Sequence, residues 1–265
     1  MKLNICFSPQ DNLLTRELSL LSEVVAQSQA AEDVVTWSLD SNLADNRLLV
    51  SLLKVFRDSD PKKIICPQLD QIAGFSTFKL NPEIANKQVK EIEADIAADS
   101  LFPSVLKVPL SYLLDELVCN MQQHSGCSEG SVFAGINPRS NCLDVIVADH
   151  GITIYGSYVN AGKYLEYVSE SPAEALSLAK DGFSTKNRPD AENRGYGISS
   201  NARMVVEGLN GSFSIISGSA VYLYSQKTGQ QIIGSSDYFE WCGTTVIARI
   251  PLEVPPHFSF YDYIS

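Results

Sequence analysis

The first third of the chain alternates between apolar residues at helical spacing and short continuous apolar runs. In chain order this pattern predicts a helix over residues 8–30, a strand over 34–39, a helix over 48–56 and a short strand over 64–66. A loop over 68–82 and an acidic helix over 83–99 follow. We expect the acidic helix to be a solvated face or a connector. These elements predict a small α/β domain over residues 1–95, with an accessory or regulatory role.

The rest of the chain begins with a strongly amphipathic helix over residues 110–124. Its apolar positions recur every three or four residues, at Leu110, Leu113, Leu114, Leu117, Val118 and Met121. Further strands are predicted at residues 131–136, 143–148, 213–216, 220–224, 231–233 and 244–250. Further helices are predicted at residues 171–182 and 198–209. Together they predict an α+β sandwich over residues 100–255, with helices on one face of a mixed, mostly antiparallel sheet.

Charge and composition exclude several classes of protein. The 265 residues carry 20 Lys and Arg against 31 Asp and Glu, a net charge of -11. Because duplex binding needs a basic surface, we expect no direct nucleic-acid partner. No apolar run approaches the ~18 residues of a membrane span, and no signal peptide is recognisable, so we expect a cytoplasmic protein with no membrane contact. With three His and no CxxC pair, a His- or Cys-based metal site is not expected.

A ribbon of polar residues follows the edge of the 110–124 helix. Glu116, Asn120 and His124 recur every four residues beside the apolar stripe. A helix that packs one edge on a sheet and presents the next edge to a cavity has this pattern. A helix flank in contact with solvent has it as well, so the spacing alone leaves both readings open.

Three further motifs follow in chain order. Asp149-His150-Gly151 comes directly after an apolar strand, where a carboxylate can accept a hydrogen bond from an amino group on a planar base. A polar, Gly-rich segment then carries Lys186, Arg194, Gly195 and Gly197 up to the start of a helix, as a phosphate site requires. Gly243-Thr244 opens the last strand. Each motif alone is equally typical of an ordinary turn or loop.

The four motifs in this order resemble those of the GHKL superfamily of ATPases. Glu116, Asn120 and His124 match its N box, and the three later motifs match its G1, G2 and G3 boxes. The resemblance covers about residues 100–255 and is closest to the histidine kinase-like branch that contains the anti-sigma-factor serine kinases. It implies a Bergerat fold that holds ATP and Mg²⁺ between the helices and the sheet.

The resemblance implies a role for each residue near the base and the metal. Asn120 would coordinate Mg²⁺, and Asp149 would accept a hydrogen bond from the adenine amino group. Gly151 would let the base lie close to the backbone, and Thr244 would support the adenine end. His124 would either contact the phosphates or cap its helix, and both alternatives stay open.

At the phosphate end, the resemblance implies that Gly195 and Gly197 cradle the phosphates with backbone N–H groups. Lys186 and Arg194 would neutralise charge on the γ-phosphate. Glu116 would orient or deprotonate the attacking water or hydroxyl, which is mainly a positioning task in phosphoryl transfer.

Two functions are compatible with the resemblance. The first is a Mg²⁺-dependent ATPase, or a kinase that transfers the γ-phosphate of ATP to a Ser or Thr of a partner protein. The alternative is a nucleotide-dependent interaction switch with little or no catalysis. A histidine autokinase is not expected, because residues 1–100 contain no His.

The resemblance also implies partners. We expect a regulatory partner protein, for which STAS-like and transcription-related proteins are candidates, and a homodimer is compatible with the sequence. Residues 155–182 are inserted between the G1 box and the Gly-rich segment, and carry Tyr155, Tyr158, Tyr164 and Tyr167. This insertion is expected to be either additional packing or a lid that binds the partner.

Overall fold

A computed structural model describes residues 3–7, 35–39, 64–65, 69, 74–138, 140–169, 171–185, 197–234 and 240–264. Its strands are β1 (Leu3–Phe7), β2 (Val35–Leu39), β3 (Ile64–Ile65), β4 (Phe75–Lys79), β5 (Glu129–Asn137), β6 (Cys142–Asp149), β7 (Ser212–Gly218), β8 (Ala220–Ser225), β9 (Gly229–Gly234) and β10 (Glu240–Pro251). Its helices are α3 (Pro82–Ala98), α4 (Lys107–His124), α5 (Thr153–Ala161), α6 (Leu165–Val168), α7 (Pro172–Lys180) and α8 (Gly197–Arg203). Short turns of other helix types are η3 (Ser104–Leu106), η5 (Met204–Gly208) and η6 (Phe260–Tyr263).

An eight-stranded sheet organises the described residues. Seven strands follow the order β4-β5-β6-β10-β7-β8-β9, and β3 pairs with the start of β10. All pairings along the seven-strand path are antiparallel, whereas β3 runs parallel to β10. β1 and β2 pair parallel in a separate two-stranded sheet. The prediction of an α+β protein with a mixed, mostly antiparallel sheet is confirmed.

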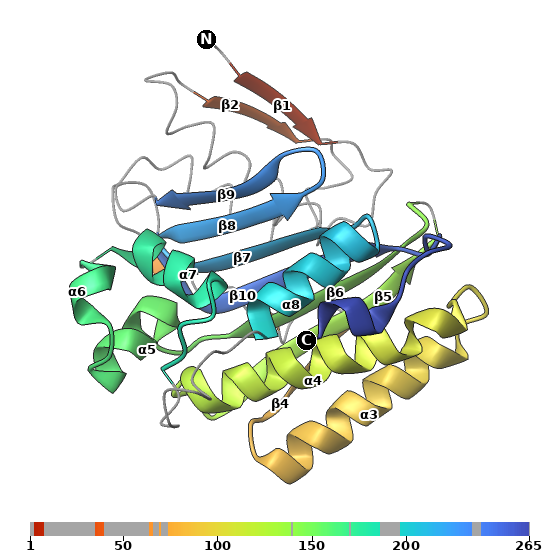
Figure 1. The fold of residues 1–265 in the computed structure, drawn as a ribbon, viewed down its shortest axis with the longest axis horizontal. Coiled ribbons are helices and arrows are strands. Elements are labelled where there is room, and N and C mark those ends of the chain that lie inside the picture. The colour runs from red at the N-terminus through yellow and green to blue at the C-terminus, as the bar shows by residue number, and fades with distance from the viewer. Residues whose placement is uncertain are drawn as a thin grey trace.

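Helices α3, α4 and α8 lie on the face of the sheet that is nearer the viewer in Figure 1. Leu113 and Leu117 of α4 are buried in one core with Val145 and Val147 of β6. The apolar stripe predicted over 110–121 is therefore the buried face of α4. Phe213 of β7 belongs to the same core. The helices rest on the sheet because alternate residues of each strand present apolar side chains to them.

The helix predicted over 171–182 is α7. The hydroxyl of Ser171 accepts a hydrogen bond from the backbone N–H of Glu174, with Pro172 in the first turn of α7. Gly182, predicted as the end of this helix, follows it with a φ of 87°. The helices expected over 8–30 and 48–56 lie outside the described residues.

In the part of the chain that the structure covers, no helix combines the length and apolar character that crossing a membrane requires.

The loop predicted over residues 68–82 was wrong, because β4 occupies 75–79. This short edge strand pairs with β5, and only Phe78 among its five residues is buried. The acidic helix predicted next is α3, whose Ala85, Val89 and Ile96 are buried against the core that contains α4. The sheet and its core thus begin before residue 100, and the division at 95–100 stays a prediction.

The helix predicted over 198–209 changes type part of the way along. It is α-helical to Arg203 and continues as the π-helical turn η5. The Val206 carbonyl in this turn accepts a hydrogen bond from the Gln226 side chain at 3.2 Å. Gly208 lies against Phe258 and Tyr263, so close that a Cβ there would lie 2.8 Å from the Tyr263 ring. Contacts from distant residues therefore accompany the widened turn, and periodicity does not reveal them.

The second face of the sheet is buried along β6, and it contains an ion pair. Asp144 of β6 is 0% exposed, and Arg249 of β10 lies directly opposite it. The Arg249 guanidinium donates from Nε to Oδ1 at 2.8 Å and from one terminal nitrogen to Oδ2 at 3.1 Å. Two hydrogen bonds in this fork geometry satisfy the carboxylate where water cannot reach it.

We predict that Arg249→Met destabilises the protein by about 3–5 kcal/mol, because Asp144 is left buried without its cation. The double variant Asp144→Leu with Arg249→Met removes both charges and is expected to recover most of this loss. Urea unfolding of the wild type and both variants measures the difference. A double variant as unstable as Arg249→Met alone would contradict the ion pair as the cause.

Candidate functional site

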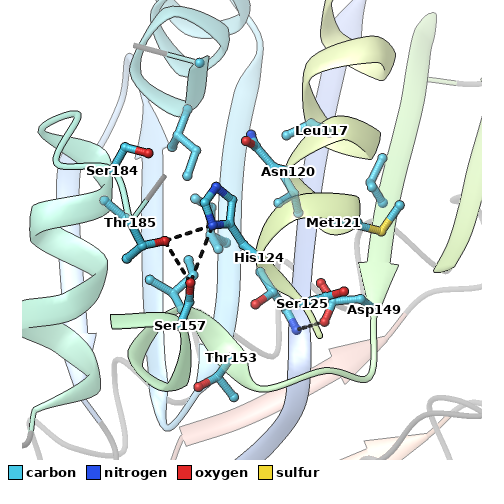
Figure 2. A pocket seen from close by; sticks show the side chains of 18 of the residues that line it. Leu117, Asn120, Met121, His124, Ser125, Asp149, Thr153, Ser157, Ser184 and Thr185 are labelled. Atoms are coloured by element: carbon cyan, nitrogen blue, oxygen red, sulfur yellow. Dashed lines mark hydrogen bonds between the residues drawn. The ribbon is translucent and has the colours of Figure 1, made fainter. Parts of the chain in front are cut away.

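A cavity of about 880 Å³, including the part open to solvent, lies between the helices and the sheet. Its walls come from α4, α5, the residues after α7, the start of α8 and strands β6, β7 and β10. Six predicted site residues line it together: Glu116, Asn120, His124, Asp149, Gly197 and Thr244. Figure 2 shows Asn120 and His124 on one wall, Ser157 and Thr185 on the facing wall, and Asp149 toward one end.

The polar ribbon on α4 is the edge of this cavity. Leu117 and Met121 of the same helix are buried in the core. Glu116, Asn120 and His124 are half-buried and line the cavity one turn apart. Of the two readings that the spacing left open, the structure selects the cavity edge over the solvated flank.

Glu116 and Gly197 are in close contact across the cavity wall. A Cβ added at Gly197 would lie 2.0 Å from Oε1 of Glu116 and 2.5 Å from its Cδ. No larger residue fits at 197 while the carboxylate stays in place. The start of α8 therefore lies directly against the carboxylate.

Asp149 ends β6 with its side chain held by two backbone groups. Its Oδ1 accepts from the N–H of Gly151 at 2.8 Å and from the N–H of Thr244 at 3.3 Å. Among the described residues, neither of these hydrogen bonds nor any other uses Oδ2. The carboxylate lines the cavity, so Oδ2 is the oxygen available to a ligand.

Backbone approaches that only glycine permits surround Asp149. A Cβ at Gly151 would lie 2.0 Å from the Ser125 carbonyl oxygen, and one at Gly243 would lie 2.1 Å from the Asp149 carbonyl oxygen. The N–H of Ile152 donates to the same Ser125 carbonyl at 2.8 Å. Gly151 is therefore needed to bring the chain after β6 against the end of α4, a reason that the resemblance did not supply.

Burial changes the acid–base behaviour of Asp149. The side chain is 6% exposed, and this desolvation raises its pKa to about 6 from 3.8. The hydrogen bonds from Gly151 and Thr244 act in the opposite direction and do not overcome the desolvation. A donor placed at Oδ2 would favour the ionised form and lower the pKa again.

Three side chains that the sequence did not group together form a cluster in the cavity. The Thr185 hydroxyl lies 2.8 Å from Nδ1 of His124 and 2.9 Å from the Ser157 hydroxyl (Figure 2). Ser157 also lies 3.5 Å from Nδ1. Ser157 comes from α5 and Thr185 from the residues after α7, so only the fold brings them to His124. Their hydroxyls carry no sequence signal, because Ser and Thr occur in many helices and loops that form no site.

Hydroxyls also support the strand side of the cavity. The Thr244 hydroxyl lies 2.9 Å from that of Ser217 on β7. The Ser217 hydroxyl in turn accepts from the backbone N–H of Ile154 at 2.8 Å. Ser217 thereby connects the first turn of α5 to β10 beside the cavity. This residue was not predicted either, since its role depends on β7 lying next to β10.

The insertion at 155–182 contributes packing to this site. Tyr158 is buried, its hydroxyl donates to the Phe183 carbonyl, and its ring lies edge-on to that of Tyr164 at 6.1 Å. Tyr155 packs against the same small core. Tyr167 is exposed. Packing is confirmed for three of the four tyrosines, whereas binding of a partner stays a prediction.

The remaining predicted residues are not part of the described chain. Lys186, Arg194 and Gly195 lie between residues 185 and 197, outside the ranges that the structure describes. Within those ranges, no three His, Cys, Asp or Glu side chains gather as a metal site. A Mg²⁺ ion, which keeps several waters and takes few protein ligands, does not need such a cluster.

Comparisons of the chain with protein-family models, with curated proteins and with solved structures found no match. We therefore infer the function below from the residues and geometry of the cavity.

We predict opposite effects of the same substitution at two glycines. Gly151→Ala sets a Cβ against the fixed Ser125 carbonyl and is expected to destabilise the protein by about 1–3 kcal/mol. At Gly197→Ala the nearest atoms to the new Cβ all belong to the Glu116 side chain, which can rotate away, so the effect on unfolding is expected to be small. Urea unfolding measures both. Equal losses at the two positions would contradict the contacts described.

We predict that Asp149 makes the stability of the ligand-free protein fall as pH rises. The folded state holds the Asp149 proton up to about pH 6, whereas the unfolded chain releases it near 3.8. The proton on Asp149 therefore stabilises the folded state fully below about pH 4, and this stabilisation is lost by about pH 6. Its contribution to the free energy of unfolding is about 3 kcal/mol. Urea unfolding across this range checks it, with Asp149→Asn as control. An equal slope in the control would contradict the assignment.

Proposed function

We propose that this cavity binds an adenine nucleotide with Mg²⁺ and that the domain is a Bergerat-fold ATPase or protein Ser/Thr kinase. The observation that carries the proposal is the Asp149 carboxylate. It is buried and ends in the cavity, with Oδ1 held by two backbone N–H groups and Oδ2 available. The helices on one face of a mostly antiparallel sheet and the four motifs around one cavity support the same proposal.

Asp149 favours adenine over guanine. Adenine carries an amino group on its six-membered ring where guanine carries a carbonyl oxygen, and a carboxylate accepts from the first and repels the second. The cavity wall near Asp149 contains Met121, Ile154 and Val246, which suit the apolar faces of a planar base. A flat base with one amino group at its edge therefore fits this end.

The opposite end of the cavity fits the phosphates. Asn120 offers a side-chain carbonyl oxygen to Mg²⁺, and bound Mg²⁺ would neutralise charge on the phosphate oxygens. Gly197 begins α8 against Glu116, and its backbone lines the same cavity. Lys186, Arg194 and Gly195 are assigned to the same end from the sequence. In a chain of net charge -11, such local groups must supply the attraction for a triphosphate.

Glu116 is the residue proposed for the chemical step. Its carboxylate lies against Gly197, and Asn120 follows it one helical turn later on α4. An oxygen of water, or of a partner's Ser or Thr, forms a bond to the γ-phosphorus while the bond to the β,γ-bridging oxygen breaks. Glu116 orients the attacking hydroxyl and takes its proton, and ADP leaves. A regulatory partner protein that supplies the hydroxyl is part of the kinase form of this proposal.

We predict that Mg-ADP stabilises the protein by about 2.7 kcal/mol at a hundredfold excess over its Kd, whereas Mg-GDP does not. Asp149→Asn should abolish the stabilisation, because an amide N–H₂ replaces the free acceptor oxygen. Asn120→Ala should keep binding of ADP and lose the part that depends on Mg²⁺. Thermal unfolding with each nucleotide measures these effects. Equal stabilisation by ADP and GDP would reject adenine recognition.

Turnover is tested separately with labelled ATP. Wild-type protein is expected to release phosphate, or to transfer it to an added partner, at least a hundredfold faster than Glu116→Ala, since general-base positioning contributes about 10²–10⁴-fold. Both proteins must first show nucleotide binding in the thermal assay. Background turnover by both, with binding intact, would reject the enzyme and favour the nucleotide-dependent interaction switch.

A further inference from the structure

The cluster of His124, Ser157 and Thr185 lies between the two ends of the cavity. Asp149 is tied to the end of α4 through Gly151, which lies against the Ser125 carbonyl. His124 is the neighbour of Ser125, and Asn120 is one helical turn, about 5.4 Å, further along α4. The cluster therefore lies in the part of the cavity between the proposed base site and the proposed phosphate site, as Figure 2 also shows.

The covalent structure of a nucleotide decides which of its parts lies beside the cluster. Its sugar connects the base to the phosphates, so a nucleotide with its base at Asp149 and its phosphates at Asn120 carries its ribose past His124. The facing wall presents Ser157 and Thr185 there. The three side chains are polar, and neither hydroxyl carries a charge, which suits a sugar diol better than a phosphate.

The hydrogen-bonding capacity of the cluster is not exhausted by its internal contacts. Thr185 lies at its centre, 2.8 Å from Nδ1 of His124 and 2.9 Å from Ser157. Each hydroxyl has one donor and two acceptor positions. Whichever ring nitrogen of His124 carries the proton, the chain of two hydroxyls retains acceptors for a ribose O–H group. Ser157 is 8% exposed and is held in place by Thr185.

From these observations we propose that Ser157 and Thr185, ordered by His124, recognise the ribose hydroxyls and select ribonucleotides over nucleotides that lack them. The inference rests on the proposed adenine nucleotide site and adds the sugar to what that site recognises. A bound sugar without hydroxyls makes none of these additional hydrogen bonds while it still displaces water from Ser157 and Thr185, and this weakens binding.

The test compares Mg-ADP with Mg-2′,3′-dideoxy-ADP by isothermal titration calorimetry. Wild-type protein is expected to bind ADP about tenfold or more tightly than the dideoxy analogue. Ser157→Ala removes one hydroxyl, and Thr185→Val replaces the other at equal volume. Each variant should reduce the ratio of the two affinities toward one by weakening ADP while leaving the dideoxy analogue nearly unchanged.

Ser177→Ala is the matched control, because it makes the same change on a serine of α7 that does not line the cavity. It should retain the wild-type ratio of affinities, and circular dichroism checks that each variant is folded. Equal affinities in the wild type, or a ratio unchanged in both Ser157→Ala and Thr185→Val, would overturn the inference while leaving adenine binding intact. Failure of the wild type to bind either nucleotide contradicts the proposed function, and the inference with it.

Discussion

The close approach of three backbone segments around Asp149 is the constraint on which the site depends. The end of α4, the residues after β6 and the start of β10, where its register against β7 shifts between Trp241 and Thr244, meet there. Their distances are ones that only glycine permits at 151 and 243. This contact sets the carboxylate in place by giving it the N–H groups of Gly151 and Thr244. It also fixes α4 relative to the sheet, and so fixes the level at which each polar residue of α4 faces the cavity.

The electrostatics of the site follow from the same contact. Asp149 is desolvated because these segments close around it, and two neutral N–H donors compensate only in part. A ligand that donates to the remaining oxygen would offset that cost, whereas an apolar or electron-rich edge would not. The buried ion pair of Asp144 and Arg249 on the second face is different, since its two hydrogen bonds satisfy the carboxylate within the protein. One buried aspartate therefore belongs to the scaffold, and the other has an oxygen available to a ligand.

Several elements could be predicted from periodicity because local sequence decides them. The apolar stripe of α4 and the Ser171 cap of α7 record which face is buried and where a helix begins. β4 was missed because an edge strand buries few residues, and here only Phe78 is buried. The π-helical turn after Arg203 was missed because packing of Gly208 against the C-terminal aromatic rings accompanies it, over a separation of some fifty residues.

The sequence by itself determined the class of fold and the types of residue at the site. A four-residue spacing puts Glu116, Asn120 and His124 on one edge of a helix whatever the rest of the chain does. Only the tertiary structure decided that this edge faces a cavity and that Ser157 and Thr185 meet His124 there. The physical reason is that periodicity reflects which face of a single element is buried. Hydrogen bonds among side chains from three elements depend on where each element lies on the sheet. The sequence around Ser157 or Thr185 does not show which other element its hydroxyl will meet in the folded chain.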